Sequence, residues 1–237
     1  MASNSEVGFG ARLAAARTAH THLQSFTTYV PPSTELSPSR YLVAINSLST
    51  LNDQTVTANN AFRTAARIRN EHFFKTPTSV EKLLVPISAA VRSAFGKSSP
   101  QFTQVSDLIT KIRGNRPPRT TAAAAEGAPD PVSQSERSYG SLAQSFADLV
   151  NTLSGFGTNY LPANPAITHT ALQDKLTAIN AANTAVANTY GALKTKRDGR
   201  LAGFGALSNT TTRIKDSVQS QYGRNSSEHS LLKSLKV

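Results

Sequence analysis

An internal repeat constrains this chain more than any other feature of its sequence. The tripeptide Tyr29-Val30-Pro31 recurs 131 positions later as Tyr160-Leu161-Pro162. At that offset the following apolar positions coincide, with Leu36 on Ile167, Tyr41 on Leu172, Ile45 on Leu176 and Leu48 on Ile179. A repeat of this length indicates one structural unit used twice in the 237-residue chain.

The register of the repeat changes once. After Phe73, which falls on Phe204, the second copy lacks four residues and the offset becomes 127. The matching positions in the new register are Phe95-Gly96-Lys97 with Tyr222-Gly223-Arg224, and Ser99 with Ser226. A shared aromatic-Gly-basic motif and one consistent gap favour a duplication over chance agreement between two helical stretches.

Each copy has the apolar spacing of four helices. In the second copy, one stripe consists of Leu142, Phe146, Leu149, Leu153, Phe156 and Tyr160, and another of Leu172, Leu176, Ile179, Asn183, Val186, Tyr190 and Leu193. Alternating steps of four and three residues are typical of helices that pack on helices. Asn52 and Asn183 occupy the same position in the apolar stripes of the two copies. Each has two interpretations: an amide that pairs across helices and fixes their register, or a tolerated Asn near solvent.

Several residues predict where these helices begin and end. Ser37-Pro38, Thr76-Pro77 and Ser99-Pro100 are expected to open the second, third and fourth helices of the first copy. Gly96 and Gly223 are expected to end a helix each, and Pro86 is expected to kink or delay the third helix.

The segment between the copies has the composition of a linker. Residues 114–138 contain Pro117-Pro118 and the run Ala122 to Ala125, with no apolar period, and change from basic to acidic along their length. We therefore predict an all-α protein of two tandem antiparallel, up-down four-helix bundles, residues 1–113 and 139–237, which this linker joins.

The residues that carry catalytic or metal chemistry do not form a recognisable site. The chain has no Cys, and its five His residues show no metal-ligand spacing with a carboxylate. The three Gly-Phe-Gly segments at Gly8, Gly155 and Gly203 are not followed by the Lys-Ser/Thr of a phosphate loop, so we interpret them as helix breaks. We expect no enzyme activity, no metal, no cofactor and no small-molecule substrate.

The sequence also carries no signal for a membrane. Residues 1–10 lack the apolar region of a signal peptide, and the longest fully apolar run, residues 83–87, is too short to span a bilayer. A cytoplasmic protein without membrane insertion is expected.

The charge of the chain points to anionic partners. Its 25 Lys and Arg against 14 Asp and Glu give a net charge of +11, which favours nucleic acid or ribonucleoprotein. The candidate polyanion-binding residues are Arg63, Arg67, Arg69, Lys111, Arg113, Arg116, Arg119, Lys194, Arg197 and Arg200. Because no base-reading motif is present, the expected binding is salt-dependent and independent of sequence.

Two other functions fit the same sequence. Two related bundles would present two related surfaces, as in the structural subunit of a homopolymeric filament or shell that self-associates. For such a structural subunit the basic surface would be incidental. A helical adaptor for a protein partner is the third possibility.

The repeated features together resemble a group of uncharacterised bacterial helical-repeat proteins. They are the Tyr-x-Pro motif, the long Ala/Thr/Asn-rich helix, the basic stretch and the final Leu-x-x-Leu helix, each present twice. The resemblance covers nearly the whole chain outside the linker. It implies a tandem helical fold and carries no activity or site residue.

Overall fold

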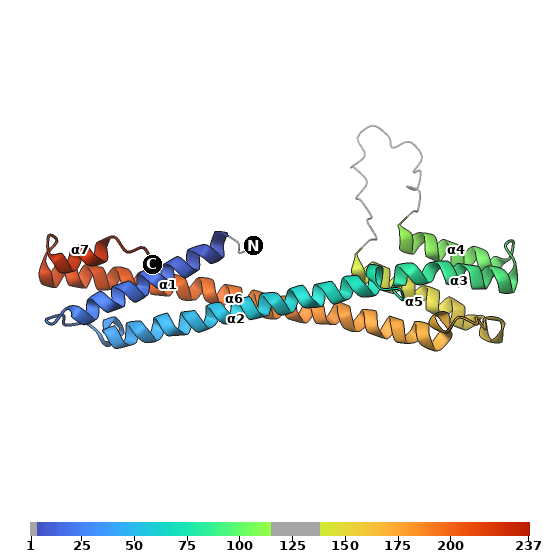
Figure 1. Cartoon of the computed structure of the whole chain (residues 1–237), viewed down its shortest axis with the longest axis horizontal. Helices are drawn as coiled ribbons and strands as arrows, with labels where there is room; N and C mark the ends of the chain where they lie inside the picture. The colour runs from blue at the N-terminus through green and yellow to red at the C-terminus, as the bar shows by residue number, and fades with distance from the viewer. Residues whose placement is uncertain (1–3, 115–137) are drawn as a thin grey trace, which may run out of the picture. The chain divides into compact units, whose positions relative to one another are not determined.

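Helices make up most of the part of the chain that its computed structural model describes, residues 4–114 and 138–237, with side chains from residue 8 onward. The helices are α1 (Asn4–Ser25), α2 (Pro38–Asn70), α3 (Val80–Phe95), α4 (Pro100–Arg113), α5 (Tyr139–Gly155), α6 (His169–Tyr222) and α7 (Ser227–Lys233) (Figure 1). Short turns η1 (Thr34–Leu36), η2 (Glu71–Lys75), η3 (Gly157–Asn159) and η4 (Pro165–Ile167) complete the elements. This confirms the predicted all-α class. No helix within the described ranges is both long and apolar enough to cross a membrane.

The helices form two compact units, which do not coincide with the two copies of the repeat. The first unit comprises Met1–Ala61 and Tyr190–Val237, and the second comprises Phe62–Thr189. Helices α2 and α6 each contribute to both units. The described residues therefore give no support to tandem bundles at 1–113 and 139–237, because the first half of one copy packs with the second half of the other. The predicted linker falls on residues 115–137, which lie outside the described part of the chain.

The core of the first unit brings together residues from both ends of the chain. Its buried residues include Leu13, Ala16 and Leu23 of α1, Tyr41, Ile45 and Leu48 of α2, Phe204, Leu207, Ile214 and Val218 of α6, and Leu232 of α7. One buried polar contact lies among them, a 2.7 Å hydrogen bond between the hydroxyls of Tyr41 and Thr211. Since α7 also packs against α1, the short final helix closes this core.

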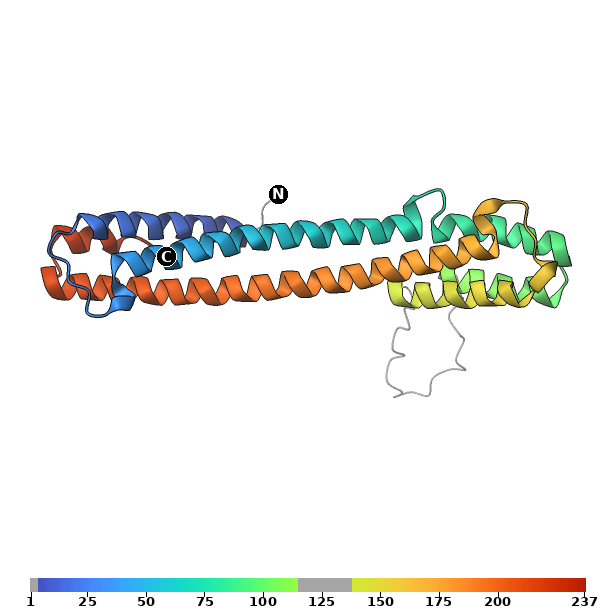
Figure 2. The ribbon, with the colours of Figure 1, turned by 90° about the horizontal axis from the view of Figure 1, so that it is seen from below.

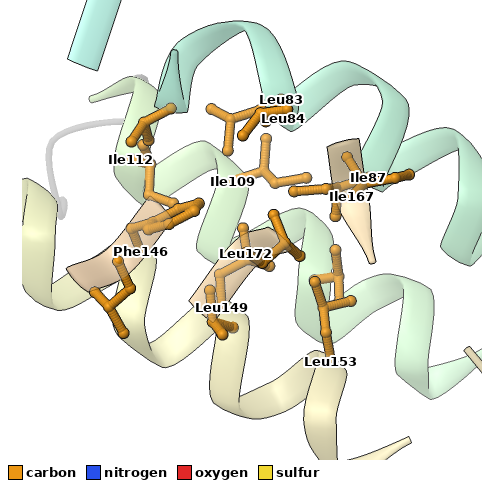
Figure 3. Packing of buried hydrophobic residues seen from close by; sticks show 14 of the residues in the cluster. Leu83, Leu84, Ile87, Ile109, Ile112, Phe146, Leu149, Leu153, Ile167 and Leu172 are labelled. Atoms are coloured by element: carbon orange, nitrogen blue, oxygen red, sulfur yellow. The ribbon is translucent and has the colours of Figure 1, made fainter. Parts of the chain in front are cut away.

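The core of the second unit lies between α3, α4, α5 and the start of α6 (Figure 3). Leu83, Leu84 and Ile87 of α3 meet Ile109 and Ile112 of α4, Phe146, Leu149 and Leu153 of α5, and Ile167 and Leu172 from η4 and α6. Helix α4 packs against both α3 and α5 (Figure 2). Removal of these large apolar side chains from water is the main driving force for this unit.

The predicted start of the fourth helix at Ser99 is confirmed, and the matched Ser226 opens α7 in the same way. The backbone N–H of Phe102 donates to Ser99 Oγ at 3.1 Å, and the N–H of His229 donates to Ser226 Oγ at 3.1 Å. Gly96 and Gly223, which end the preceding helices, have φ values of 89° and 93°, a conformation that side chains disfavour.

Four predicted boundaries are wrong. Helix α3 begins at Val80 after Ser79, not at Thr76-Pro77, and it continues through Pro86 to Phe95. The second and third helices of the second copy are one 54-residue helix, α6, because the four missing residues fall where the first copy turns between η2 and α3. Of the three Gly-Phe-Gly segments, only the one at Gly155 ends a helix, and those at Gly8 and Gly203 lie inside α1 and α6.

Corresponding positions of the two copies make corresponding contacts. The Tyr29 hydroxyl donates to the Leu36 carbonyl at 3.3 Å, and the Tyr160 hydroxyl donates to the Ile167 carbonyl at 2.9 Å. The hydroxyls at the matched positions Ser37 and Thr168 likewise donate to carbonyls three residues earlier, at 2.7 and 3.3 Å. The same loop therefore occurs once in each unit.

Candidate polyanion-binding surface

The structure divides the predicted basic residues between the two units. Lys194, Arg197 and Arg200 lie on α6 in the first unit. The second unit holds Arg63, Arg67 and Arg69 on α2 and Lys111 and Arg113 on α4. Arg116 and Arg119 lie outside the described residues. The described candidates therefore fall into two groups, one in each unit.

Arg200 is buried, in contrast to the predicted position on a partner-facing surface. Only 6% of the residue is exposed, its Nη1 donates to Asn52 Oδ1 at 3.1 Å, and its Cζ lies 4.4 Å from the ring centroid of Phe9. A guanidinium tolerates burial when an aromatic face and a hydrogen-bond acceptor replace its water. Arg200 thus joins α1, α2 and α6 within the first unit instead of meeting a ligand.

Arg69 occupies the matching position in the second unit and has a similar role. Its Cζ lies 3.8 Å from the ring centroid of Tyr139, and the ring of Phe73 packs edge-on against the same tyrosine at 5.1 Å. Arg69 is half-buried, with no hydrogen-bond partner for its Nε among the described residues. Its main contact is the stacking that joins α2 to the start of α5.

The two seam asparagines accompany these arginines. Asn52 accepts from Arg200 across helices, and Asn183 Nδ2 donates to the Tyr139 carbonyl at 3.4 Å. Both amides therefore bond to a neighbouring helix, as the first of their two interpretations predicts. Asn183 Oδ1 is buried without a partner in the described structure.

Two exposed candidates are partly neutralised by carboxylates one helical turn away. Arg67 Nη1 lies 2.6 Å from Glu71 Oε1, and Lys194 Nζ lies 2.6 Å from Asp198 Oδ2. The hydrogen bond to Asp198 raises the pKa of Lys194, so this lysine stays charged. A polyanion at either position would have to compete with the neighbouring carboxylate.

A second group of cations on α6 is held by neutral amides. Lys196 Nζ donates to Gln54 Oε1 at 2.9 Å, and Arg197 Nη2 donates to Asn59 Oδ1 at 3.3 Å. An amide oxygen orients a cation without cancelling its charge, and each cation retains further N–H donors. We call Lys196 and Arg197 the amide-held pair; Arg197 is exposed and Lys196 half-exposed.

Sequence reasoning missed Lys196, Gln54 and Asn59. Gln54 and Asn59 lie on α2 and the cations on α6, more than 130 positions away. No local spacing connects these positions, because the contact exists only when the first half of one copy packs with the second half of the other. The signal that was available, a cluster of cations at residues 194–200, identified the helix but not the residues across from it.

The remaining candidates lie on the surface of the second unit. Arg63 and Arg113 are exposed and Lys111 is half-buried, and none of the three has an ion-pair partner among the described side chains. The same part of the chain contains no group of three or more His, Asp or Glu residues arranged to hold a metal ion.

Comparison with known proteins finds no match, either to a family model, to a curated protein or to a solved structure. The resemblance to bacterial helical-repeat proteins therefore stays a prediction.

Proposed function

We propose that this chain is a non-enzymatic cytoplasmic protein that binds a polyanion, nucleic acid or ribonucleoprotein, without sequence specificity. The amide-held pair carries the proposal. Lys196 and Arg197 are consecutive residues of α6, are oriented by Gln54 and Asn59, and have no ion-pair partner among the described side chains. Lys194, three residues before Arg197 on the same helix, is paired with Asp198 and is therefore not counted with the pair.

The chemistry of this surface fits phosphate groups rather than bases. Lys and Arg side chains that contact phosphates release condensed counterions, which gives affinity that falls steeply with salt and does not depend on sequence. A positive net charge of +11 adds a general attraction for the same partners. Arg200 and Arg69 are excluded from this role because aromatic rings and helix contacts occupy them.

The test compares two double variants that remove the same charge. K196Q/R197Q removes the amide-held pair, whereas R92Q/K97Q removes one Arg and one Lys from exposed positions of the second unit. Binding to a fluorescent 30-mer duplex DNA and a single-stranded RNA is followed by anisotropy between 50 and 300 mM salt. K196Q/R197Q should flatten the slope of log affinity against log salt by about 1–2, since each lost duplex phosphate contact removes about 0.9. Equal slopes for the two variants would remove the amide-held pair from the binding surface.

Self-association as a structural subunit is the second candidate, and one observation favours it. Val30 and Leu161 occupy the same position in the two copies and are 69% and 80% exposed. Repeated exposed apolar residues are suited to heterologous contacts that propagate between copies. Light scattering at low and high salt, with and without nuclease, separates the candidates: a polymer that survives both treatments favours self-association, and nuclease-sensitive mass at low salt favours polyanion binding.

We also propose that the chain arose by duplication of one four-helix segment, with the halves of the two copies exchanged between the compact units. The paired tyrosine contacts at Leu36 and Ile167 and the paired caps at Ser99 and Ser226 support this. Exchange of identical elements is an accessible route to such an arrangement, since both partners already carry the matching apolar stripe.

A further inference from the structure

The second unit contains a cavity of about 500 Å³ between α3 and the loop that leads into η4. On the α3 side it is lined by small residues, among them Ala90 and Ala94, and on the other side by residues 159–164. Leu161 lines the cavity, although its own side chain is 80% exposed. The volume lies within the usual range of roughly 300–1,000 Å³ for ligand pockets.

In the matching place of the first unit, a glutamine is hydrogen-bonded to the loop. In the register of the repeat, Gln221 corresponds to Ala94, and Val30 corresponds to Leu161. The backbone N–H of Val30 donates to Gln221 Oε1 at 3.0 Å, and Gln221 Nε2 donates to the Val30 carbonyl at 2.5 Å. Gln221 Nε2 also donates to Ser217 Oγ at 3.1 Å. One carboxamide therefore satisfies both backbone groups of the loop residue.

The second unit lacks every part of this clamp. Ala94 and Ala90 stand where Gln221 and Ser217 stand in the first unit, and a methyl group supplies neither donor nor acceptor. Within the described residues, the backbone N–H and carbonyl of Leu161 have no hydrogen-bond partner. The cavity therefore has an alanine where the first unit has Gln221, and it presents the backbone N–H and carbonyl of Leu161, which a carboxamide would satisfy.

We propose that this cavity binds a glutamine side chain from a peptide segment of a protein partner. The incoming carboxamide accepts from the Leu161 N–H and donates to the Leu161 carbonyl, as Gln221 does with Val30. The cavity is larger than one carboxamide, and its wall of Pro86 and alanines offers apolar contact to the residues on either side of the glutamine. This site is independent of the amide-held pair, which lies in the other unit.

The test uses the full chain and two acetylated, amidated tripeptides, Ala-Gln-Leu and Ala-Glu-Leu, the second of which lacks the amide donor. Each peptide is titrated to 10 mM while amide resonances are followed by two-dimensional NMR. The Gln peptide should shift the Leu161 N–H with saturation, and the Glu peptide should bind at least tenfold more weakly. No saturable shift at Leu161, or equal shifts with both peptides, would overturn the proposal.

Two variants test the site by adding the glutamine to the second unit or removing it from the first. A94Q places the missing glutamine in the second unit and should weaken peptide binding at least tenfold, whereas A202Q, at an exposed position of α6, should leave it unchanged. Q221A removes the carboxamide that is bound to Val30 and should make the Val30 N–H respond to the Gln peptide as Leu161 does. Unweakened binding by A94Q contradicts the site, even if Q221A fails to fold.

Discussion

Gly203 of α6 lies against Leu48 of α2 so closely that a Cβ built on the glycine would stand 2.4 Å from Leu48 Cδ2. Real Cβ atoms do not approach other atoms so closely, so any larger residue at this position would displace Leu48 within the core of the first unit. The glycine inside α6 therefore leaves room for the Leu48 side chain, although glycine is otherwise unfavourable within a helix.

We expect G203A and G205A to have opposite effects on stability. Alanine is favoured over glycine in a helix by about 1 kcal/mol, and nothing lies within 4 Å of a Cβ at Gly205, so G205A should stabilise the protein by roughly 0.5–1 kcal/mol. At Gly203 the same gain is opposed by an overpacking cost of about 1–3 kcal/mol. Urea unfolding followed by circular dichroism measures both; a G203A protein as stable as G205A would show that Leu48 moves aside freely.

Substitutions at Arg197 and Arg200 should have different effects, one on binding and the other on stability. R200Q removes a buried guanidinium from Phe9 and Asn52, and we expect it to lower the free energy of unfolding by roughly 1–3 kcal/mol. R197Q changes an exposed residue and should alter stability by no more than about 0.5 kcal/mol while weakening polyanion binding. Thermal unfolding and anisotropy on the same samples check this, and the reverse pattern would return Arg200 to the binding surface.

Much of the secondary structure was predictable because its signals are local. The Ser99-Pro100 start and the Gly96 end depend only on neighbouring backbone groups. The four-three stripes identify which face of each helix is buried, but they cannot identify which helix covers it, because both copies carry equivalent stripes. The exchange of halves between the units was therefore not accessible from periodicity.

The candidate site was predictable only in part for the same reason. The cluster of cations around Arg197 is visible in the sequence, whereas the burial of Arg200 depends on Phe9, which is 191 positions away. The Gly-Phe-Gly pattern was misleading because Gly203 meets a packing requirement and not a turn.

Charge at the amide-held pair can be cancelled without removing either cation. Q54E and N59D convert the two orienting amides to carboxylates of nearly the same shape, and the double variant places negative charge beside Lys196 and Arg197. We expect the variant to stay folded and to lose nucleic-acid affinity at least tenfold at low salt, since a fixed carboxylate competes with phosphate. Anisotropy measures the loss; retained affinity would mean that the phosphates bind elsewhere.

The protein should lose stability at alkaline pH in part through Tyr160. Burial raises the pKa of Tyr160 to about 12, above its ordinary value of 10.0. Above pH 10 the unfolded chain releases this proton while the folded chain holds it, so stability present below pH 10 is lost as the pH rises toward 12. The size is on the order of 2 kcal/mol. Urea unfolding at pH 8 and pH 11.5 should show a smaller difference for Y160F than for the unchanged protein; an equal difference would assign the alkaline loss to other groups.

The contact between Tyr41 and Thr211 tests whether the two copies of the repeat exchange halves between the compact units, as in the structure. Thr211 donates to the Leu207 carbonyl at 2.7 Å, so the Tyr41 hydroxyl, also at 2.7 Å, donates to Thr211. Tyr41 belongs to the first copy of the repeat and Thr211 to the second. In two tandem bundles these residues would lie in different cores and would not interact.

A double-mutant cycle of Y41F, T211V and the double variant measures this contact directly. Because the hydrogen bond is buried, we expect a coupling free energy of about 0.5–1.5 kcal/mol from urea unfolding. The control cycle pairs Y41F with T212V, since Thr212 is exposed and bonds only within its own helix, to Ser208. Additive effects at Tyr41 and Thr211 to within about 0.3 kcal/mol would contradict the exchange of halves and restore the tandem arrangement.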